Sequence, residues 1–303
     1  MSSAANRSFI VYVLILIALI AYLFVSAPPP LPEAKAAGAT VPVERVFAIV
    51  EAENDVVRAL WTQEIVASGK KVGLKFDEDW REAGVEAGPL PALFLRETAK
   101  SLEKHPVQLS LFLGSDFPIR EANRFAGPQM AKFLRIKATR EPEFFFEPST
   151  GRHTAMFSDT AVVEACICHN EHPQSPKNDW RLNEVMGATT WMYPASEATL
   201  EELMQILHAL RQGFREAYSA YLNKAKTFSA PPAIGERWPR EGYYLPAVEV
   251  FLAEVAKRAS HETLAAMHAA LEPNAKPESD AQRVAEAQIA SPRPTALSDL
   301  SAQ

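Results

Sequence analysis

The residues best suited to chemistry lie together in one short segment. Cys166 and Cys168 are the only two cysteines of the chain, and His169 follows them directly. Two thiols followed by a histidine are typical of covalent c-type haem attachment, in which the thiols bond to the vinyl groups and the imidazole binds iron. The usual spacing is C-x-x-C-H, whereas this chain reads C-x-C-H. On a helical turn, side chains at i and i+2 point about 200° apart, so attachment through both thiols would need a distorted loop.

Other chemistry for this segment stays open. A disulfide between residues so close in sequence would close a small, strained ring. Zinc is a second candidate, because thiolate and imidazole both suit that ion. The candidate zinc ligands are Cys166, Cys168, His169 and His172. The side chains that could supply a sixth ligand to a haem iron are His172, His153 and Met156. No G-x-S-x-G, phosphate-loop or metalloprotease motif is present, and we do not expect an enzyme.

The residues around the thiols carry a resemblance to a known family. The chain reads CHNEHPQSPKNDW from Cys168 to Trp180 and EVMG from Glu184 to Gly187. Upstream, the segments GPLPA (88–92) and LGSDFP (113–118) are similar to further segments of the same family. Over about residues 46–194 the chain thus resembles the periplasmic c-type-haem sensor domain, which occurs in bacterial sensor kinases, cyclases and chemoreceptors.

The resemblance implies a PAS-like α+β domain that binds haem c. In it, Cys168 matches the second attachment cysteine and His169 the iron ligand. Cys166 matches the first thiol only if one residue has been deleted between the cysteines, and without a deletion Ala165 stands at that position. A domain that keeps the fold and has lost the cofactor is the alternative.

A long apolar run near the N-terminus predicts a membrane anchor. Residues 9–25 read FIVYVLILIALIAYLFV, which matches the roughly 17–25 residues of a helix that crosses a bilayer. A cleavable signal peptide is the alternative, although the run exceeds the usual core of about 7–15 residues. Arg7 before the run favours a cytoplasmic N-terminus. We therefore expect a single-pass protein of the bacterial inner membrane, held in lipid by residues 1–27, with its body in the periplasm.

Composition divides the rest of the chain into four parts. The Pro- and Ala-rich residues 28–42 predict a stiff spacer, and residues 272–303 predict a flexible tail. Residues 43–195 predict the α+β domain, in which a small antiparallel sheet is flanked by helices. Its expected helices are 43–68 and 92–104, and its expected strands are 107–113, 144–146, 154–163 and 188–192.

Residues 196–271 predict an α-helical hairpin, with Ser196 as the N-cap of its first helix. Apolar residues recur at spacings of 3 and 4 from Leu200 to Tyr221, which makes a heptad seam. This seam packs either within the chain or against another subunit. The side chains that would contact another subunit are Leu200, Leu203, Leu207, Leu210 and Phe214. A net charge of −6 without a basic stripe argues against nucleic acid as a partner.

Two functions are consistent with these features. The first is a membrane-anchored periplasmic haem protein that serves as a redox or gas sensor subunit, or as an electron carrier. Sensor relatives cross the membrane twice and end in a cytoplasmic output domain, whereas this chain has one apolar run and no recognisable output domain. The second is a cofactor-free accessory or scaffold subunit of a larger membrane complex, respiratory or photosynthetic.

Overall fold

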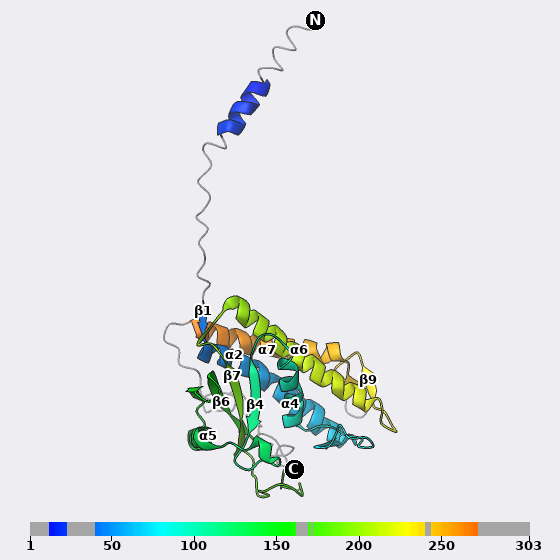
Figure 1. The fold of residues 1–303 in the computed structure, drawn as a ribbon. Coiled ribbons are helices and arrows are strands. Elements are labelled where there is room, and N and C mark those ends of the chain that lie inside the picture. Colours follow the sequence, from blue (N-terminus) through cyan, green and yellow to red (C-terminus); the bar gives the residue numbers. More distant parts are fainter. Residues whose placement is uncertain (1–11, 23–39, 162–168, 171, 240–243, 272–303) are drawn as a thin grey trace, which may run out of the picture. The chain divides into compact units, whose positions relative to one another are not determined.

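The computed structural model describes residues 12–22, 40–161, 169–170, 172–239 and 244–271 (Figure 1). The chain forms two units, residues 1–39 and residues 40–303. In the first unit, residues 12–22 are helical. The second unit contains the remaining described helices and strands, so the helices of the predicted hairpin belong to the same unit as the sheet.

The structure contradicts the transmembrane anchor predicted over residues 1–27. The helix of residues 12–22 is shorter than the roughly 17–25 residues that a bilayer crossing needs. The prediction used the whole apolar run of residues 9–25, whose ends lie outside the described residues. No helix in the described part of the chain is both long and apolar enough to span a membrane. The transmembrane part of the predicted fold class is therefore wrong, and so is the single-pass inner-membrane location that was based on it.

A four-stranded antiparallel sheet lies at the centre of the second unit, in the order β4-β7-β6-β5. Its strands are β4 (Ser110–Gly114), β5 (Glu143–Glu147), β6 (Arg152–Thr160) and β7 (Val185–Tyr193). Alternate side chains point to opposite faces, and both faces are apolar. Leu111, Ala155 and Trp191 belong to the main core, whereas Met156 and Ala188 belong to a second core on the other face.

Helices cover both faces of this sheet and make three layers (Figure 1). On the main-core side, α4 contacts β4 and α2 contacts β6, while α6 packs on α4 and α7 packs on α2. The helices of this side are α2 (Val43–Ala59), α4 (Pro91–Leu102), α6 (Leu200–Ala225) and α7 (Val248–Leu271). On the other side, Phe133 and Ile136 of α5 (Gly127–Thr139) pack with Phe125 and Met156.

Shorter elements complete the second unit. The helix that begins with α2 continues through a π-helix, η1 (Leu60–Ala67), into α3 (Ser68–Lys71). A 3-10 turn, η2, spans Glu121–Asn123. The paired short strands are β1 (Thr40–Pro42) with β8 (Glu197–Thr199), β2 (Phe76–Asp77) with β3 (Gly88–Pro89), and β9 (Ala233–Gly235) with β10 (Tyr244–Pro246).

The apolar seam of α6 lies inside this chain. Leu203, Leu207, Leu210 and Phe214 are at most 6% exposed and belong to the main core, whereas Leu200 is 48% exposed. Four of the five side chains considered for a partner subunit therefore pack against the chain's own helices. The N-cap of α6 is Thr199 instead of Ser196, because Thr199 and Glu202 form a reciprocal capping box.

Candidate functional site

A cleft of about 120 Å³ lies in the second unit where the first turn of α4 meets the adjoining ends of the sheet strands. Its lining comes from the start of α4 with its N-cap (residues 90–93 and Arg96), from the end of β4 and the segment after it (residues 113–115 and 117–120), from Met186 and Gly187 of β7, and from His169. These are the same segments that carry the resemblance to the haem sensor domain, and the fold brings them together although up to about a hundred residues separate them. Glu78, Asn123 and Asp159 complete the lining.

Gly187 allows β7 to approach β4 closely beside the cleft. A Cβ atom on Gly187 would lie 2.5 Å from the carbonyl oxygen of Gly114, which is closer than real Cβ contacts allow. Ser115 strengthens the same junction, because its hydroxyl donates a hydrogen bond of 2.5 Å to the carbonyl of Met186. The glycine of the segment EVMG thus serves to close the strand junction that forms one wall of the cleft, whereas Gly114 of LGSDFP leaves room for the Phe125 ring, which would lie 2.4 Å from a Cβ atom at that position.

His169 presents a mostly buried imidazole to the cleft. Its Nδ1 atom is buried and has no hydrogen-bond partner among the described residues. Burial of the His169 side chain lowers its pKa. The nearby charges of His172 and Arg96 lower this pKa further, whereas the charge of Asp159 raises it. Asp159 is itself held by Arg58, which donates a hydrogen bond of 2.8 Å to its carboxylate. The imidazole is therefore favoured in its neutral form, which is the form that binds metal ions.

The loop after His169 is fixed by contacts with Trp180. The amide of Asn170 donates a hydrogen bond of 2.9 Å to the Trp180 carbonyl and accepts one of 2.8 Å from the Trp180 N–H. The Lys177 ammonium lies 4.4 Å from the centre of the Trp180 ring. The Ser175 hydroxyl donates a hydrogen bond of 2.6 Å to the Lys177 carbonyl. Much of the CHNEHPQSPKNDW segment thus has a structural role, which is to hold the loop that begins with His169.

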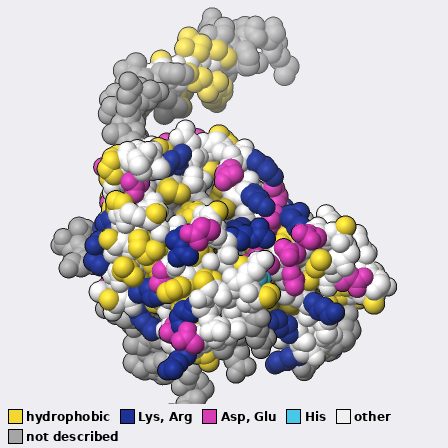
Figure 2. Space-filling view, turned by 60° about the horizontal axis from the view of Figure 1, so that its bottom comes forward, with side chains coloured by type: hydrophobic (Ala, Val, Ile, Leu, Met, Phe, Trp, Pro, Cys, Tyr) yellow, Lys and Arg dark blue, Asp and Glu magenta, His cyan; other side chains and the backbone are white. Residues whose placement is uncertain are grey.

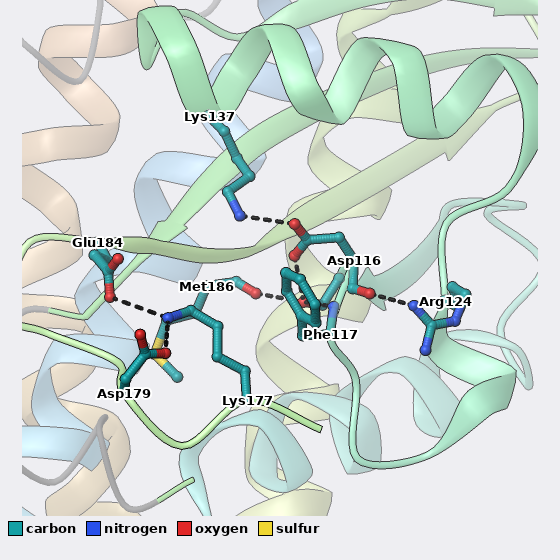
Figure 3. A network of polar contacts seen from close by, with 9 residues as sticks. Asp116, Phe117, Arg124, Lys137, Lys177, Asp179, Glu184 and Met186 are labelled. Atoms are coloured by element: carbon teal, nitrogen blue, oxygen red, sulfur yellow. Dashed lines mark hydrogen bonds and ion pairs between the residues drawn. The ribbon is translucent and has the colours of Figure 1, made fainter. Parts of the chain in front are cut away.

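A polar network connects this loop with α5 and the segment after β4 (Figure 3). The Lys137 ammonium lies 2.7 Å from the Asp116 carboxylate and 5.7 Å from the centre of the Trp180 ring. Arg124 donates a hydrogen bond to the Asp116 carbonyl. Lys177 pairs with Asp179, and its ammonium also lies 3.9 Å from the Glu184 carboxylate (Figure 3). The Trp180 ring is therefore near two cations, one from α5 and one from its own loop.

The other residues predicted for the site lie in several places. Cys166 and Cys168 fall outside the described residues. His172 lies near His169, and its Nδ1 atom accepts a hydrogen bond of 3.2 Å from the Gln174 N–H. Met156 is fully buried in the core between the sheet and α5. His153 lies on β6 six residues from Asp159, a distance of about 20 Å at the rise of a strand. Of the histidines and methionine predicted as iron ligands, only His169 is part of the cleft lining.

Within the described residues, no group of three or more His, Cys, Asp or Glu side chains is placed to hold a metal ion. The zinc hypothesis needs both cysteines, so these residues do not test it. The described residues could therefore supply fewer than three of these side chains to a metal, His169 among them, with further ligands supplied by a cofactor or by the cysteines.

Charged residues of the cleft were not predicted as site residues. Arg120 lies 3.7 Å from the carboxylate of Glu78 and 3.6 Å from that of Asp79. Arg96 lines the cleft from α4 and is partly buried. Lone arginines and acids are common on protein surfaces, so nothing in the sequence near these residues marked them.

No family model, curated protein or solved structure matches this chain. The resemblance to the c-type-haem sensor domain therefore stays a prediction. In the structure, residues from each of the segments that carry the resemblance line one cleft.

Proposed function

We propose that the second unit is a c-type-haem-binding domain that acts as a redox or gas sensor, or as an electron carrier. One observation carries this proposal. His169, the direct neighbour of Cys168, lines the cleft together with the segments that carry the resemblance. Its Nδ1 atom is buried and has no hydrogen-bond partner among the described residues. A thioether from Cys168 and an iron ligand from His169 would hold the cofactor.

The chemistry of the cleft suits part of a haem. Leu90, Leu93, Leu113 and Ile119 supply apolar contacts, and arginines are suited to pairing with carboxylates. A volume of about 120 Å³ is below the roughly 300–1,000 Å³ of pockets that enclose a whole ligand, so the cleft would take one edge of the cofactor. When bound, haem supplies an iron that exchanges one electron or binds a diatomic gas.

The chain's own residues would have defined tasks in such a protein. His169 stays neutral because it is buried, which keeps a nitrogen lone pair available to the iron. Asn170 and Trp180 fix the loop and so orient the imidazole. Asp159 accepts a hydrogen bond from Arg58, and its negative charge acts on the His169 imidazole by raising the pKa.

Intact-mass measurement and visible spectroscopy test the proposal. The full chain is expressed in a host with c-type haem maturation machinery. We expect the mass of one added haem and a Soret band, both lost in Cys168→Ser and both retained in Cys166→Ser. His169→Ala should keep the added mass and change the spectrum of the iron. A wild-type chain without added mass and without a Soret band would refute covalent haem binding.

A cofactor-free subunit of a larger assembly is the second candidate. It is favoured by the contacts that hold the loop after His169, because Asn170, Lys177 and Trp180 fix that loop without any cofactor. In this case, mild purification of the native protein should yield stoichiometric partner proteins and no haem. A haem-free, monodisperse monomer would contradict this second candidate.

A further inference from the structure

The charged surface of the second unit does not single out a partner. Lys and Arg side chains lie intermingled with Asp and Glu on the face shown in Figure 2, so neither sign of charge dominates there. The edges of the sheet are more informative, because an edge strand leaves backbone N–H and C=O groups unpaired. The strand order β4-β7-β6-β5 gives this sheet two edges, β4 and β5.

The outer edge of β5 is open. β5 pairs with β6 over residues 143–147, and no other described strand pairs with it. Within the described residues, the only backbone hydrogen bonds that reach β5 from outside the ladder come from its own hairpin turn to the Glu147 carbonyl. At the other edge, by contrast, residues 123–125 bond to the backbone of Ser115, directly after β4. β5 therefore presents unpaired backbone groups to a further strand.

The usual protection of an edge strand is missing from β5. Natural edges are commonly guarded by lysine, by proline or by a bulge within the strand. β5 reads EFFFE and pairs with β6 in an unbroken register, so it has none of the three. Its charged residues, Glu143 and Glu147, stand at its two ends, and Phe146 is 52% exposed. Such an edge is suited to pairing.

The sequence of this strand reads the same in both directions. Residues 142–148 are PEFFFEP, with Phe145 at the centre. If two copies pair antiparallel about Phe145, each Phe144 lies opposite a Phe146, and these aromatic pairs stabilise the ladder. A two-fold interface needs this self-complementarity, because every pair of residues occurs in it twice. The prolines at both ends have no N–H to donate, so a shifted ladder would lose pairs.

The acidic residues at the strand ends do not oppose this pairing. Glu143 accepts hydrogen bonds of 2.6 and 2.8 Å from Arg135, and the Lys132 ammonium lies 3.5 Å from its carboxylate. Glu147 is 7% exposed and accepts a hydrogen bond of 2.9 Å from the Ser149 hydroxyl. The two-fold register would place Glu147 beside the partner's Glu143 with its two cations. The charges that meet across the axis are therefore complementary.

We propose that the outer edge of β5 binds β5 of a second copy of this chain in antiparallel orientation. The two four-stranded sheets would then form one continuous sheet. Five residues a side bury less than the roughly 800 Å² per partner of a standard interface, so we expect a dimer with a Kd in the micromolar range. This surface is separate from the cleft beside His169, and the inference does not depend on haem binding.

Sedimentation velocity of the full chain at several concentrations tests the dimer. The buffer contains a reducing agent and a mild detergent that covers the exposed apolar side chains of residues 12–22. Phe146→Lys should weaken dimerisation at least tenfold, because it places a charge on the edge. Leu134→Lys is the matched control, since Leu134 is also 52% exposed but lies on α5, and it should change dimerisation less than twofold. In the wild-type chain, the backbone amides of β5 should exchange more slowly with deuterium as the concentration rises, a result that needs no variant.

A mixture of two variants tests the two-fold register. In this register the two copies of residue 146 are diagonal neighbours on the same face of the sheet, within reach of long side chains. A mixture of Phe146→Lys and Phe146→Glu should therefore associate more tightly than either variant alone. A wild-type chain that stays monomeric up to roughly 1 mM would overturn the proposal. Equal effects of the two lysine variants, or a mixture no tighter than its components, would overturn it as well.

Discussion

Replacing Asn170 with alanine should destabilise the second unit, because it removes two hydrogen bonds that fix the loop after His169. The Asn170 amide donates to the Trp180 carbonyl at 2.9 Å and accepts from the Trp180 N–H at 2.8 Å. Each such bond contributes about 0.5–1.5 kcal/mol to stability. Trp180 is only 3% exposed, so water reaches its freed backbone groups only if the loop moves. We therefore expect Asn170→Ala to lower the free energy of unfolding by about 1–3 kcal/mol.

Urea unfolding followed by tryptophan fluorescence measures this loss. Asn178→Ala is the matched control, because Asn178 is an exposed asparagine in the same loop and its replacement should change stability by less than about 0.5 kcal/mol. Fluorescence of the folded Asn170→Ala protein should also shift to longer wavelength as Trp180 becomes wetter. If the two alanine variants unfold at the same urea concentration, the loop is not held by Asn170 and its role in orienting His169 fails.

Three further predictions concern the helices and the sheet. Phe214→Ala on α6 should cost about 3–5 kcal/mol in urea unfolding because Phe214 is fully buried, whereas Met204→Ala on the same helix should cost little because Met204 is 61% exposed; equal losses would contradict the packing of α6. Gly187→Ala should cost about 1–3 kcal/mol, since its Cβ would lie 2.5 Å from a carbonyl oxygen of β4, and an unchanged Tm would argue against this close approach. A hydrogen bond from Arg135 lowers the pKa of Glu143 below its ordinary value of 4.5, so its carboxylate stabilises the fold above that pH and loses this effect as the pH falls. Glu143→Gln should thus cost about 0.2–1 kcal/mol at neutral pH and progressively less as the pH falls below 4.5, and a loss independent of pH would contradict an ionic contribution.

Local periodicity in the sequence located most of the long elements of the second unit. The helix predicted over residues 43–68 corresponds to the continuous run from α2 through η1 to α3, and the helix over 92–104 corresponds to α4. The helix α5 was missed, because only Phe133 and Ile136 of its residues are buried and so its apolar stripe is short. The start of α6 was placed three residues early, although the spacing from Thr199 to Glu202 is a readable capping-box pattern.

The candidate site was only partly predictable for a physical reason. The segment around His169 could be found because thiols and imidazole are rare and chemically distinctive. Arg96 could not, because its place in the cleft lining depends on the packing of α4 against the sheet end. The contact between Arg58 and Asp159 joins residues 101 positions apart, so no local pattern encodes it. Residue type thus indicated a candidate ligand, and only the fold indicated the charged residues around it.

The shortened spacing of the cysteines affects a different part of the site from the one that positions His169. The difference from C-x-x-C-H lies before His169, in a segment outside the described residues. The hydrogen bonds that fix the loop lie after His169, between Asn170 and Trp180. The spacing between the thiols and the contacts of Asn170 with Trp180 therefore belong to different stretches of the sequence. If the resemblance holds, Cys168 stands directly before the histidine as in C-x-x-C-H, so one thioether and one iron ligand would be compatible with C-x-C-H, and only a bond to Cys166 would depend on the shorter spacing.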